Sequence, residues 1–439
     1  MFRLISYNMR FVTNATENVR LKIDSLAYGP YGIGRHEGRV IMVPLTVPGD
    51  EAEIRIVQDK GNYSIGELAN LIQPSPLRQE PPCPYVGACG GCPWQPVRYE
   101  AQLEAKAQSV AEALRRIGKL DGFEMLPILP SPREYRYRRR IRLHADADKR
   151  LGFHRAFSHQ LVEIDSCLIA TENADRRLQA ARQWAAGLKS RIVEVEIVES
   201  DAGDRVVLVG KVDGDIAPED DSANARFLES HPEIQGTVLF GRGSRRSWGE
   251  AKIAVDCGDS LTMAVDAEVF IQVNREGNSG LVRELLAWGE FNPRDRGLEL
   301  YCGAGNFTLP AARRVKEIVA VEGDPRAIDN GRINAQANGL GNIRWIRAHA
   351  PRAAAQLREK GATFSKIILN PPRSGAKGLE RDLAALGAQK ILYVSCNPAT
   401  LARDLAALEK KGYRTLRVRP VDLFPHTFHV ETLAEIALR

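Results

Sequence analysis

The sequence has no long apolar run and no recognisable export signal. Hydrophobic residues make up 44% and charged residues 26% of its 439 positions, the balance of an ordinary soluble protein. No stretch approaches the roughly 18 consecutive apolar residues of a membrane span. The first residues, MFRLISYNMRF, place arginines inside their only apolar stretch and offer no small-residue cleavage site. We therefore expect a cytoplasmic protein without membrane partners.

Cysteine is scarce, and its count is odd. Seven cysteines without an export signal argue against a disulfide framework and for reduced thiols or metal ligands. Cys83, Cys89 and Cys92 lie close together in CPYVGACGGCPW, where glycines let the chain wrap tightly, and Cys167 is a candidate fourth ligand. This spacing predicts a metal site but does not separate zinc from a four-iron cluster.

The excess of positive charge is small. The net charge is +6, and the pI is about 8.9, which gives only a modest preference for polyanionic partners. One stretch, YRYRRRIRL from Tyr135, concentrates arginine and interleaves it with aromatic residues. If it is a strand, alternate arginines share one face beside the aromatics, as in RNA-contacting surfaces. A solvated charged face is the alternative.

The sequence shows no internal repeat, and its patterns change along the chain. Residues 19–71 alternate like short strands between glycines, which predicts an all-β barrel of about five strands. Its loops carry residues suited to nucleic acid, among them Arg35, Lys60 and Tyr63. Residues 99–117 have helical periodicity, and strands dominate from there to about residue 273, with a helix near 173–188. From Gly277 onward strands and helices alternate, which predicts a doubly wound parallel sheet.

The doubly wound part lacks a complete dinucleotide fingerprint. The strand Leu298–Tyr301 leads into Cys-Gly-Ala-Gly-Asn, but Phe307 and Thr308 stand where a third glycine is needed. Glu322 ends the next strand, where an acid can hold both hydroxyls of a ribose. This combination favours S-adenosylmethionine, which has no pyrophosphate to cradle. Asn370-Pro371-Pro372 strengthens that interpretation.

Cys396 is a candidate nucleophile. It follows the apolar strand 391–394, so it lies at the carboxyl edge of the sheet, where open α/β folds bind ligands. A helix begins just after it, and a helix N-terminus lowers the pKa of a thiol. The alternative is a buried structural cysteine, which is the interpretation we give to Cys257 and Cys302.

Taken in order, these motifs resemble one family across nearly the whole chain, from about Asn14. The chain is similar to the TrmA/RlmD-type RNA uracil-5-methyltransferases, in particular to ribosomal RNA members with an N-terminal TRAM barrel. The resemblance rests on the segments DSLAYGPYGIGRHEG, CPYVGACGGCPWQ, YRYRRRIRL, FIQVN, LYCGAGNFTLP, NPPRSG, VSCNPATLARD and FPHTFHVE.

The resemblance implies a multidomain α/β fold. It has a TRAM/OB-like β-barrel at residues 12–73 and a central, mainly antiparallel β domain with an iron–sulfur site and RNA contacts. It ends in a Rossmann-like class I methyltransferase domain that binds S-adenosylmethionine. The central domain comprises residues 74–98 and 125–268, and the methyltransferase domain comprises residues 99–124 and 269–439.

The resemblance also assigns roles to individual residues. Cys396 matches the nucleophile that adds to uracil C6, and Glu431 matches the base that removes the C5 proton. The expected ligands of a [4Fe-4S] cluster are Cys83, Cys89, Cys92 and Cys167. The expected S-adenosylmethionine contacts are Gln272, Tyr301, Asn306, Glu322, His349 and Asn370.

Two positions depart from the family pattern. Asn370 replaces the usual aspartate and loses its charge, and His349 stands where an acid or amide is common. The expected activity is 5-methyluridine formation in RNA, with 23S ribosomal RNA favoured over transfer RNA, by a monomeric enzyme. A catalytically silent RNA-binding or assembly protein is the alternative that Asn370 favours. An amino methyltransferase is disfavoured because Arg373, and not an aromatic residue, follows the prolines.

Overall fold

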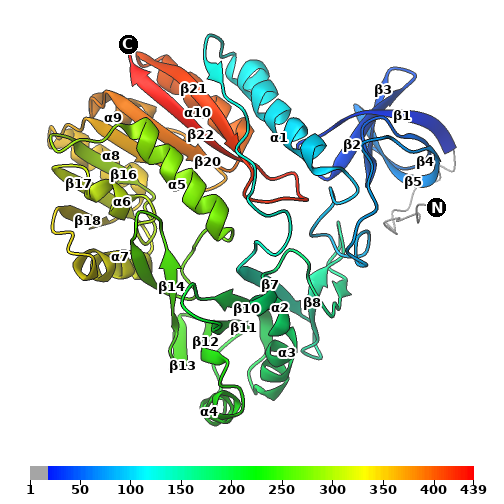
Figure 1. The fold of residues 1–439 in the computed structure, drawn as a ribbon, viewed down its shortest axis with the longest axis horizontal. Coiled ribbons are helices and arrows are strands. Elements are labelled where there is room, and N and C mark those ends of the chain that lie inside the picture. The colour runs from blue at the N-terminus through cyan, green and yellow to red at the C-terminus, as the bar shows by residue number, and fades with distance from the viewer. Residues whose placement is uncertain (1–17) are drawn as a thin grey trace.

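The computed structural model describes residues 18–439. Residues 12–17, with which the predicted barrel domain begins, lie outside this range, as does the whole N-terminal stretch MFRLISYNMRF. Figure 1 shows a small barrel, a central β-rich region and a C-terminal α/β region. Within the described part of the chain, no helix is both long and apolar enough to cross a bilayer.

The first five strands close into a barrel, in the order β1-β2-β3-β5-β4. In the first strand Val19, Leu21 and Ile23 are buried and the residues between them are exposed, so one side of each strand supplies the barrel core. The predicted five-stranded barrel is therefore confirmed. Its strands are β1 (Asn18–Leu26), β2 (Tyr31–His36), β3 (Arg39–Pro44), β4 (Glu51–Asp59) and β5 (Tyr63–Gln73).

One helix joins the barrel to the C-terminal region. α1 (Tyr99–Ala113) continues into a π-helical turn, η1 (Leu114–Gly118), which matches the predicted helix at 99–117. Val110 and Leu114 are fully buried against the C-terminal region. In Figure 1, α1 lies between the blue barrel and the red C-terminal strands.

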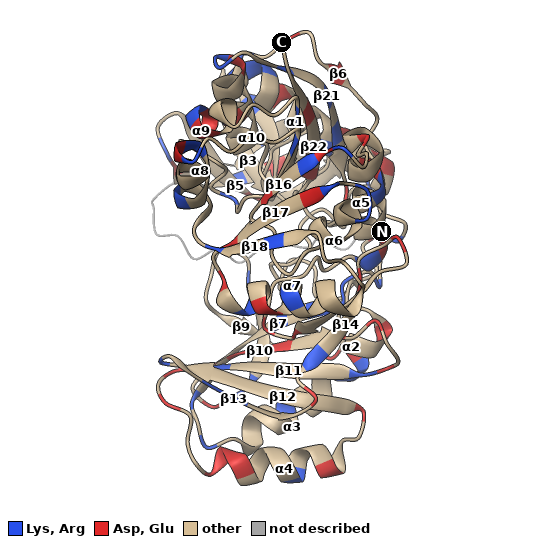
Figure 2. Ribbon diagram, turned by 90° about the vertical axis from the view of Figure 1, so that its left-hand side faces the viewer, with Lys and Arg blue, Asp and Glu red and all other residues tan. Residues whose placement is uncertain are grey.

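The central region is a seven-stranded sheet in the order β13-β12-β11-β10-β7-β8-β9. Every neighbouring pair is antiparallel except β11 and β12, so the predicted mainly antiparallel sheet is confirmed. Figure 2 shows basic and acidic positions mixed over this region. The strands are β7 (Arg140–Ala145), β8 (Leu151–His154), β9 (Leu161–Val162), β10 (Ile192–Glu199), β11 (Val206–Val212), β12 (Ile234–Gly241) and β13 (Ser244–Gly249).

Three helices accompany this sheet. α2 (Glu172–Arg176) and α3 (Leu178–Gly187) replace the single helix predicted near 173–188, and α4 (Asp220–Ser230) follows β11. Trp184 is buried among the strand residues of one face. These helices therefore cover one side of the central sheet.

The arginine run does not form one exposed face. The strand β7 begins only at Arg140, and Arg136 has a positive φ of 56°, so the expected alternation along a single strand is wrong. Arg139 is only 2% exposed and forms an ion pair with Asp201 at 2.5 Å. Arg142 pairs with Glu196 at 2.6 Å. Most of these guanidinium groups therefore hold the domain together.

A hairpin connects the central region to the C-terminal one. β14 (Lys252–Asp256) pairs with β15 (Thr262–Asp266), and the hairpin packs on α7 (Pro325–Ala337). Asn330 accepts a hydrogen bond from the backbone of Asp266 at 2.7 Å, and Asn334 accepts one from that of Ala264 at 2.8 Å. These side chains fasten the hairpin to the helix.

The C-terminal region is an eight-stranded sheet in the order β18-β17-β16-β19-β20-β22-β21-β6. Five strands, β16 to β20, run parallel, which confirms the predicted doubly wound arrangement. The strands are β6 (Glu124–Met125), β16 (Arg296–Leu300), β17 (Glu317–Glu322), β18 (Ile343–Arg347), β19 (Lys366–Leu369), β20 (Lys390–Ser395), β21 (Tyr413–Val421) and β22 (Glu431–Leu438).

Helices cover both faces of this sheet. Alternate strand residues pack to opposite sides, so that Ile391 and Tyr393 contact one set of helices while Leu392 and Val394 contact the other. The first set is α1, α8 (Ala350–Glu359), α9 (Glu380–Ala385) and α10 (Pro398–Glu409); the second is α5 (Arg275–Gly289) and α6 (Thr308–Ala312).

Candidate active site

The predicted site residues of the C-terminal region gather at one edge of the sheet. Each stands at or just beyond the carboxyl end of a parallel strand, which is where open α/β sheets bind ligands. No single stretch of sequence contains them, and the sheet brings them together. They are Tyr301 after β16, Glu322 at the end of β17, His349 after β18, Asn370 after β19 and Cys396 after β20.

Glu322 ties two loops of this edge together. Its carboxylate accepts hydrogen bonds from the backbone of Gly303 at 3.0 Å and from that of Gly323 at 2.6 Å. Gly303 and Gly305 have φ values of 55° and 105°, a region that favours glycine. The glycines therefore allow the tight turn after β16, and Glu322 holds that turn beside the end of β17.

Asn306 contacts α5, and Gln272 lies two residues before its N-cap, Asn274. Asn306 exchanges two hydrogen bonds with Asn278, at 2.9 and 3.0 Å. Gln272 is 8% exposed, and its carbonyl oxygen accepts from Arg139 at 2.9 Å. The structure thus fixes both positions through contacts with other elements.

Cys396 and Glu431 are facing positions of one strand pair. β20 and β22 run antiparallel, with Ser395 paired to Thr432. The next step of that register sets Cys396 opposite Glu431, and facing residues of an antiparallel pair have Cβ atoms about 4.5–5.5 Å apart. The separation of 35 positions in sequence therefore corresponds to direct proximity in the fold.

Burial governs the protonation of this pair. Burial and the nearby Glu431 together raise the pKa of the Cys396 thiol to about 11, against the lowering effect of Arg373. The prediction that the helix N-terminus gives this thiol a low pKa is therefore wrong, because desolvation of the thiolate outweighs it. Burial also raises the pKa of Glu431 to about 8, against the lowering effect of Arg373.

Arg373 is the cation of the site, and the sequence analysis assigned it no role there. Its backbone carbonyl accepts from Asn397 at 3.3 Å and from Thr400 at 3.2 Å, which anchors it to the start of α10. Its guanidinium group donates to a ring nitrogen of His429 at 3.3 Å. Burial and Arg373 lower the pKa of His429 to about 4, so this ring is a neutral acceptor near pH 7.

Tyr28 brings the N-terminal barrel into the same site. Its hydroxyl donates to the Cys396 carbonyl oxygen at 3.0 Å, and its ring meets Phe428 edge to face at 5.8 Å. Next to it, the Trp94 indole donates to the carbonyl of Gly29 at 3.1 Å. The barrel loop after β1 therefore forms part of the wall around the candidate nucleophile.

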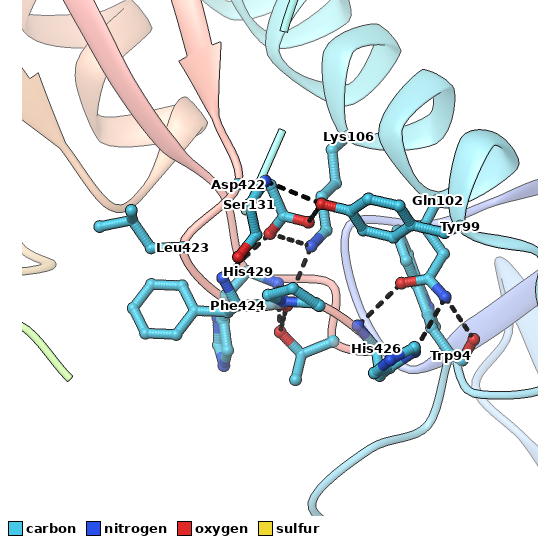
Figure 3. Close-up of polar contacts among 12 residues, drawn as sticks. Trp94, Tyr99, Gln102, Lys106, Ser131, Asp422, Leu423, Phe424, His426 and His429 are labelled. Carbon is cyan, nitrogen blue, oxygen red and sulfur yellow. Dashed lines mark hydrogen bonds and ion pairs between the residues drawn. The ribbon is translucent and has the colours of Figure 1, made fainter. Parts of the chain in front are cut away.

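A buried network fixes the loop that leads to Glu431 (Figure 3). Lys106 of α1 and Asp422 are both fully buried and form an ion pair at 2.7 Å. Lys106 also donates to the carbonyl of Phe424 at 3.0 Å, and the Tyr99 hydroxyl donates to Asp422 at 3.0 Å. α1 thereby holds residues 422–424 in place at the end of β21.

The far end of the same loop is fixed by an amide. Gln102, also on α1, accepts from the backbone of His426 at 2.8 Å and donates to the carbonyl of Val97 at 2.8 Å. Burial lowers the pKa of His426 to about 4, which keeps its ring neutral. The segment between β21 and β22 is therefore held at two points before it reaches Glu431.

The four predicted cluster ligands line one cavity of the central region. Its volume is about 220 Å³, and mostly apolar side chains surround the thiols. All seven cysteines are free thiols. Within residues 18–439, no three His, Cys, Asp or Glu side chains converge as ligands of a single metal ion. The cavity is lined by Cys83, Cys89, Cys92 and Cys167.

The sequence analysis gave no role to Tyr28, Arg373 or the Lys106–Asp422 pair, which the fold brings to the site. Tyr28 and Arg373 stand within two of the segments that carry the family resemblance, DSLAYGPYGIGRHEG and NPPRSG, and those segments were the available signal. Nothing in the sequence marks Lys106 and Asp422 as partners.

Comparison with protein families gives two matches. A family model described as tRNA (Uracil-5-)-methyltransferase matches residues 98–436. A TRAM domain model matches residues 15–69, which correspond to the barrel. Together the two matches span almost the whole chain.

Individual relatives extend this result. The chain is 33% identical to the 23S rRNA (uracil(1939)-C(5))-methyltransferase RlmD of Pectobacterium atrosepticum, over 99% of this chain and 97% of that protein. It is 34% identical to the protein of the same name from Yersinia enterocolitica, over 99% and 98%. Among solved structures, the Pyrococcus abyssi tRNA (uracil-54, C5)-methyltransferase in complex with S-adenosyl-L-homocysteine matches with a TM-score of 0.73. That match has 25% identity and covers 95% of this chain and 100% of the other.

Proposed function

Because this chain belongs to the tRNA (uracil-5-)-methyltransferase family, we propose that it methylates uracil C5 in 23S ribosomal RNA through Cys396 and Glu431. The family consists of S-adenosylmethionine-dependent RNA uracil C5-methyltransferases. The observation that supports these two residues is their facing position at the end of the β20–β22 pair, with Arg373 beside them.

The proposed reaction begins at Cys396. Uracil C5 is a poor nucleophile, and addition of a thiolate to C6 gives an enolate that is nucleophilic at C5. The thiol must first lose its proton, and Arg373 is the nearby cation that favours the thiolate. S-adenosylmethionine, when bound, supplies the electrophilic methyl group.

Glu431 completes the reaction. After C5 has gained the methyl group, the Glu431 carboxylate takes the C5 proton, and the electron pair of that C–H bond forms the C5–C6 double bond. The bond between Cys396 and C6 breaks in the same step and returns the thiolate. Because burial raises the pKa of Glu431 to about 8, a fraction of this group is ionised near neutral pH.

The remaining edge residues form the proposed cofactor site. Glu322, at the end of β17, is placed to accept from ribose hydroxyls, as acids at this position do. We also assign contacts with S-adenosylmethionine to five further residues, which are Gln272, Tyr301, Asn306, His349 and Asn370.

We further propose that the four thiols of the central region hold a [4Fe-4S] cluster. Their shared cavity of about 220 Å³ and their free state fit a group that takes one thiolate at each iron. A tetrahedral zinc site with four sulfurs about 2.3 Å from one point is the alternative. An anaerobic preparation with visible charge-transfer absorption and bound iron supports the cluster; a colourless protein that contains zinc contradicts it.

A covalent trap tests the chemistry. RNA that contains 5-fluorouridine has no C5 proton to remove, so the enzyme, with S-adenosylmethionine, is expected to remain joined to the RNA. Cys396→Ala should form no adduct, whereas Cys257→Ala, at a buried cysteine with no proposed role in the reaction, should form it normally. Absence of an adduct with the wild-type protein would favour a silent RNA-binding protein.

The choice of RNA needs a separate experiment. The sequence similarity to 23S rRNA enzymes supports ribosomal RNA, and the structural similarity to an enzyme that acts on tRNA makes transfer RNA the second candidate. Mapping of 5-methyluridine in both RNAs from a strain without the gene distinguishes them. Loss from 23S rRNA alone is the expected result, and loss from tRNA alone would overturn it.

A further inference from the structure

A second cavity opens where the central region meets the start of α5. Its volume is about 520 Å³, within the 300–1,000 Å³ that ligand sites commonly occupy. Its floor is buried and includes Arg139, Asn173 and Asn274, and its rim is exposed and includes Arg133 and Arg176. None of the proposed catalytic, cofactor or cluster residues lines it.

The side chain of Asn173 has no hydrogen-bond partner on this floor. The residue is 4% exposed, yet neither its amide nitrogen nor its amide oxygen forms a hydrogen bond. Burial raises the pKa of the neighbouring Glu199, and Thr171 and the Asn173 amide oppose that rise. The Asn173 amide therefore lies near the Glu199 carboxylate, but not at the distance and angle of a formed hydrogen bond. Buried polar groups are nearly always paired, so this amide points to a ligand that supplies both a donor and an acceptor.

Asn224 shows how a buried asparagine of the same region is normally satisfied. It is fully buried, and its oxygen accepts from the Trp184 indole at 2.8 Å and from the Thr237 hydroxyl at 2.6 Å. Its nitrogen donates to the Asp220 carbonyl at 2.7 Å. Asn224 is therefore a structural residue, and it provides a matched control for Asn173.

The other charges of the cavity exclude a simple anion site. Five arginines and five carboxylates line it, so its charge is balanced. Arg139 still offers one buried N–H group, Nη2, without a partner. A flat group with donors and acceptors along its edge fits this lining better than a phosphate, which only accepts.

The cavity adjoins the proposed active site through Arg139. The Arg139 side chain donates to the carbonyl of Gln272 at 2.9 Å, and its backbone donates to that of Val273 at 2.9 Å. The next residue, Asn274, lines the cavity. A group bound here therefore lies against the segment that carries Gln272, a proposed contact with S-adenosylmethionine.

We propose that this cavity holds an unpaired nucleobase of the RNA substrate, a nucleotide other than the methylated uridine, bound by the Asn173 amide and the Arg139 guanidinium group. The proposal rests on the proposed function, since it requires an RNA substrate. Proteins that recognise RNA by sequence bind bases of single-stranded segments through hydrogen bonds along their edges. The cavity supplies such a set of groups at a distance from the catalytic pair.

The first test compares Asn173→Ala with Asn224→Ala. Thermal unfolding should be unchanged or raised in Asn173→Ala and lowered in Asn224→Ala, because only Asn224 makes hydrogen bonds within the protein. The KM for unmodified 23S rRNA should rise at least tenfold in Asn173→Ala, with the KM for S-adenosylmethionine unchanged. An unchanged KM for RNA, or a loss of thermal stability like that of Asn224→Ala, overturns the proposal.

The second test locates the base and does not depend on turnover. Short RNAs that contain the target uridine carry one abasic position each, and their affinities for Cys396→Ala are measured with and without Asn173→Ala. At one position other than the target, loss of the base should lower the affinity of the Cys396→Ala protein for the RNA but leave the affinity of the double variant unchanged. If each abasic position lowers the RNA affinity of both proteins by the same factor, the cavity holds no base. If the wild type forms no adduct with 5-fluorouridine RNA, the proposed function fails, and these affinities still decide the role of the cavity.

Discussion

The Tyr28 hydroxyl donates a hydrogen bond of 3.0 Å to the carbonyl oxygen of Cys396, 368 positions later in the sequence. The barrel is thus joined to the backbone of the proposed nucleophile itself. A domain attached only as an RNA-gripping module would not need this contact. The barrel therefore has a role in shaping the active site as well as any role in binding RNA.

Tyr28→Phe tests this contact. The variant loses one hydrogen bond and keeps the ring against Phe428, so we expect kcat to fall about five- to tenfold, the equivalent of about 1 kcal/mol. Thermal unfolding and the KM for S-adenosylmethionine should not change. Tyr63→Phe removes a hydroxyl elsewhere in the barrel and serves as the control. An equal fall in both variants would assign the effect to the barrel as a whole.

Glu431→Gln should stabilise the protein at high pH. Burial raises the pKa of Glu431 from 4.5 to about 8, so below the unfolded-state pKa the carboxyl is neutral in both states and costs nothing. As pH rises from there through about 8, the unfolded chain ionises first and the wild type loses stability relative to the variant. Between the two ends of this pH window, the free energy of unfolding of the wild type, measured with urea, should fall relative to that of the variant by a few kcal/mol at most.

A similar dependence on pH in both proteins would contradict this account, because glutamine does not titrate. The comparison uses unfolding of the protein alone, so it is independent of the loss of activity that the proposed mechanism predicts for the same variant. It therefore reports on the environment of the carboxyl group and not on its chemical role.

Arg373→Ala should move the pH–rate profile. Cys396 and Glu431 both act in their deprotonated forms, and burial raises the pKa of each, so kcat should rise with pH through about 8 and onward to about 11. Arg373 lowers both values, and its removal should shift the rising limb to higher pH. Arg373→Lys keeps the charge and should restore most of the profile. The rising limb reports the pKa values of Cys396 and Glu431 as a coupled pair. If it does not move in Arg373→Ala, Arg373 does not lower these pKa values.

Lys106→Met should destabilise the protein strongly. It leaves the fully buried Asp422 without its cation, and breaking a buried ion pair in this way costs about 3–5 kcal/mol. The double variant Lys106→Met with Asp422→Asn removes the stranded charge and should recover part of that loss in denaturant unfolding. Arg20→Ala breaks an exposed pair with Glu51 and should cost at most about 1 kcal/mol. Equal losses in the single and double variants would contradict this account of the pair.

Local patterns in the sequence predict the parts of this protein that local forces determine. The barrel, the helix at α1 and the parallel sheet follow from alternation and helical periodicity, and the strand ends place Glu322 and Cys396 at one edge. The arginine run shows the limit. Its composition indicates an exposed RNA-binding face, but the buried Asp201 partner of Arg139 lies 62 positions away and is invisible to any local pattern.

The protonation of Cys396 shows the same limit at the site. The helix that begins at Pro398 is correctly predicted. The packing of Tyr28, Glu431 and neighbouring segments around the sulfur decides the outcome, because it removes the solvent that stabilises a thiolate. Such packing involves residues hundreds of positions apart.

The register of β20 and β22 makes the alignment of Cys396 with Glu431 independent of the chain between them. α10, β21 and the loop that follows can lengthen or shorten through evolution, provided that Ser395 still faces Thr432. A slip of one residue would instead turn the carboxylate to the opposite face of the sheet, with little change in the number of backbone hydrogen bonds. Insertions in this interval are thus tolerated or inactivating according to whether they preserve the strand pairing, and not according to their length.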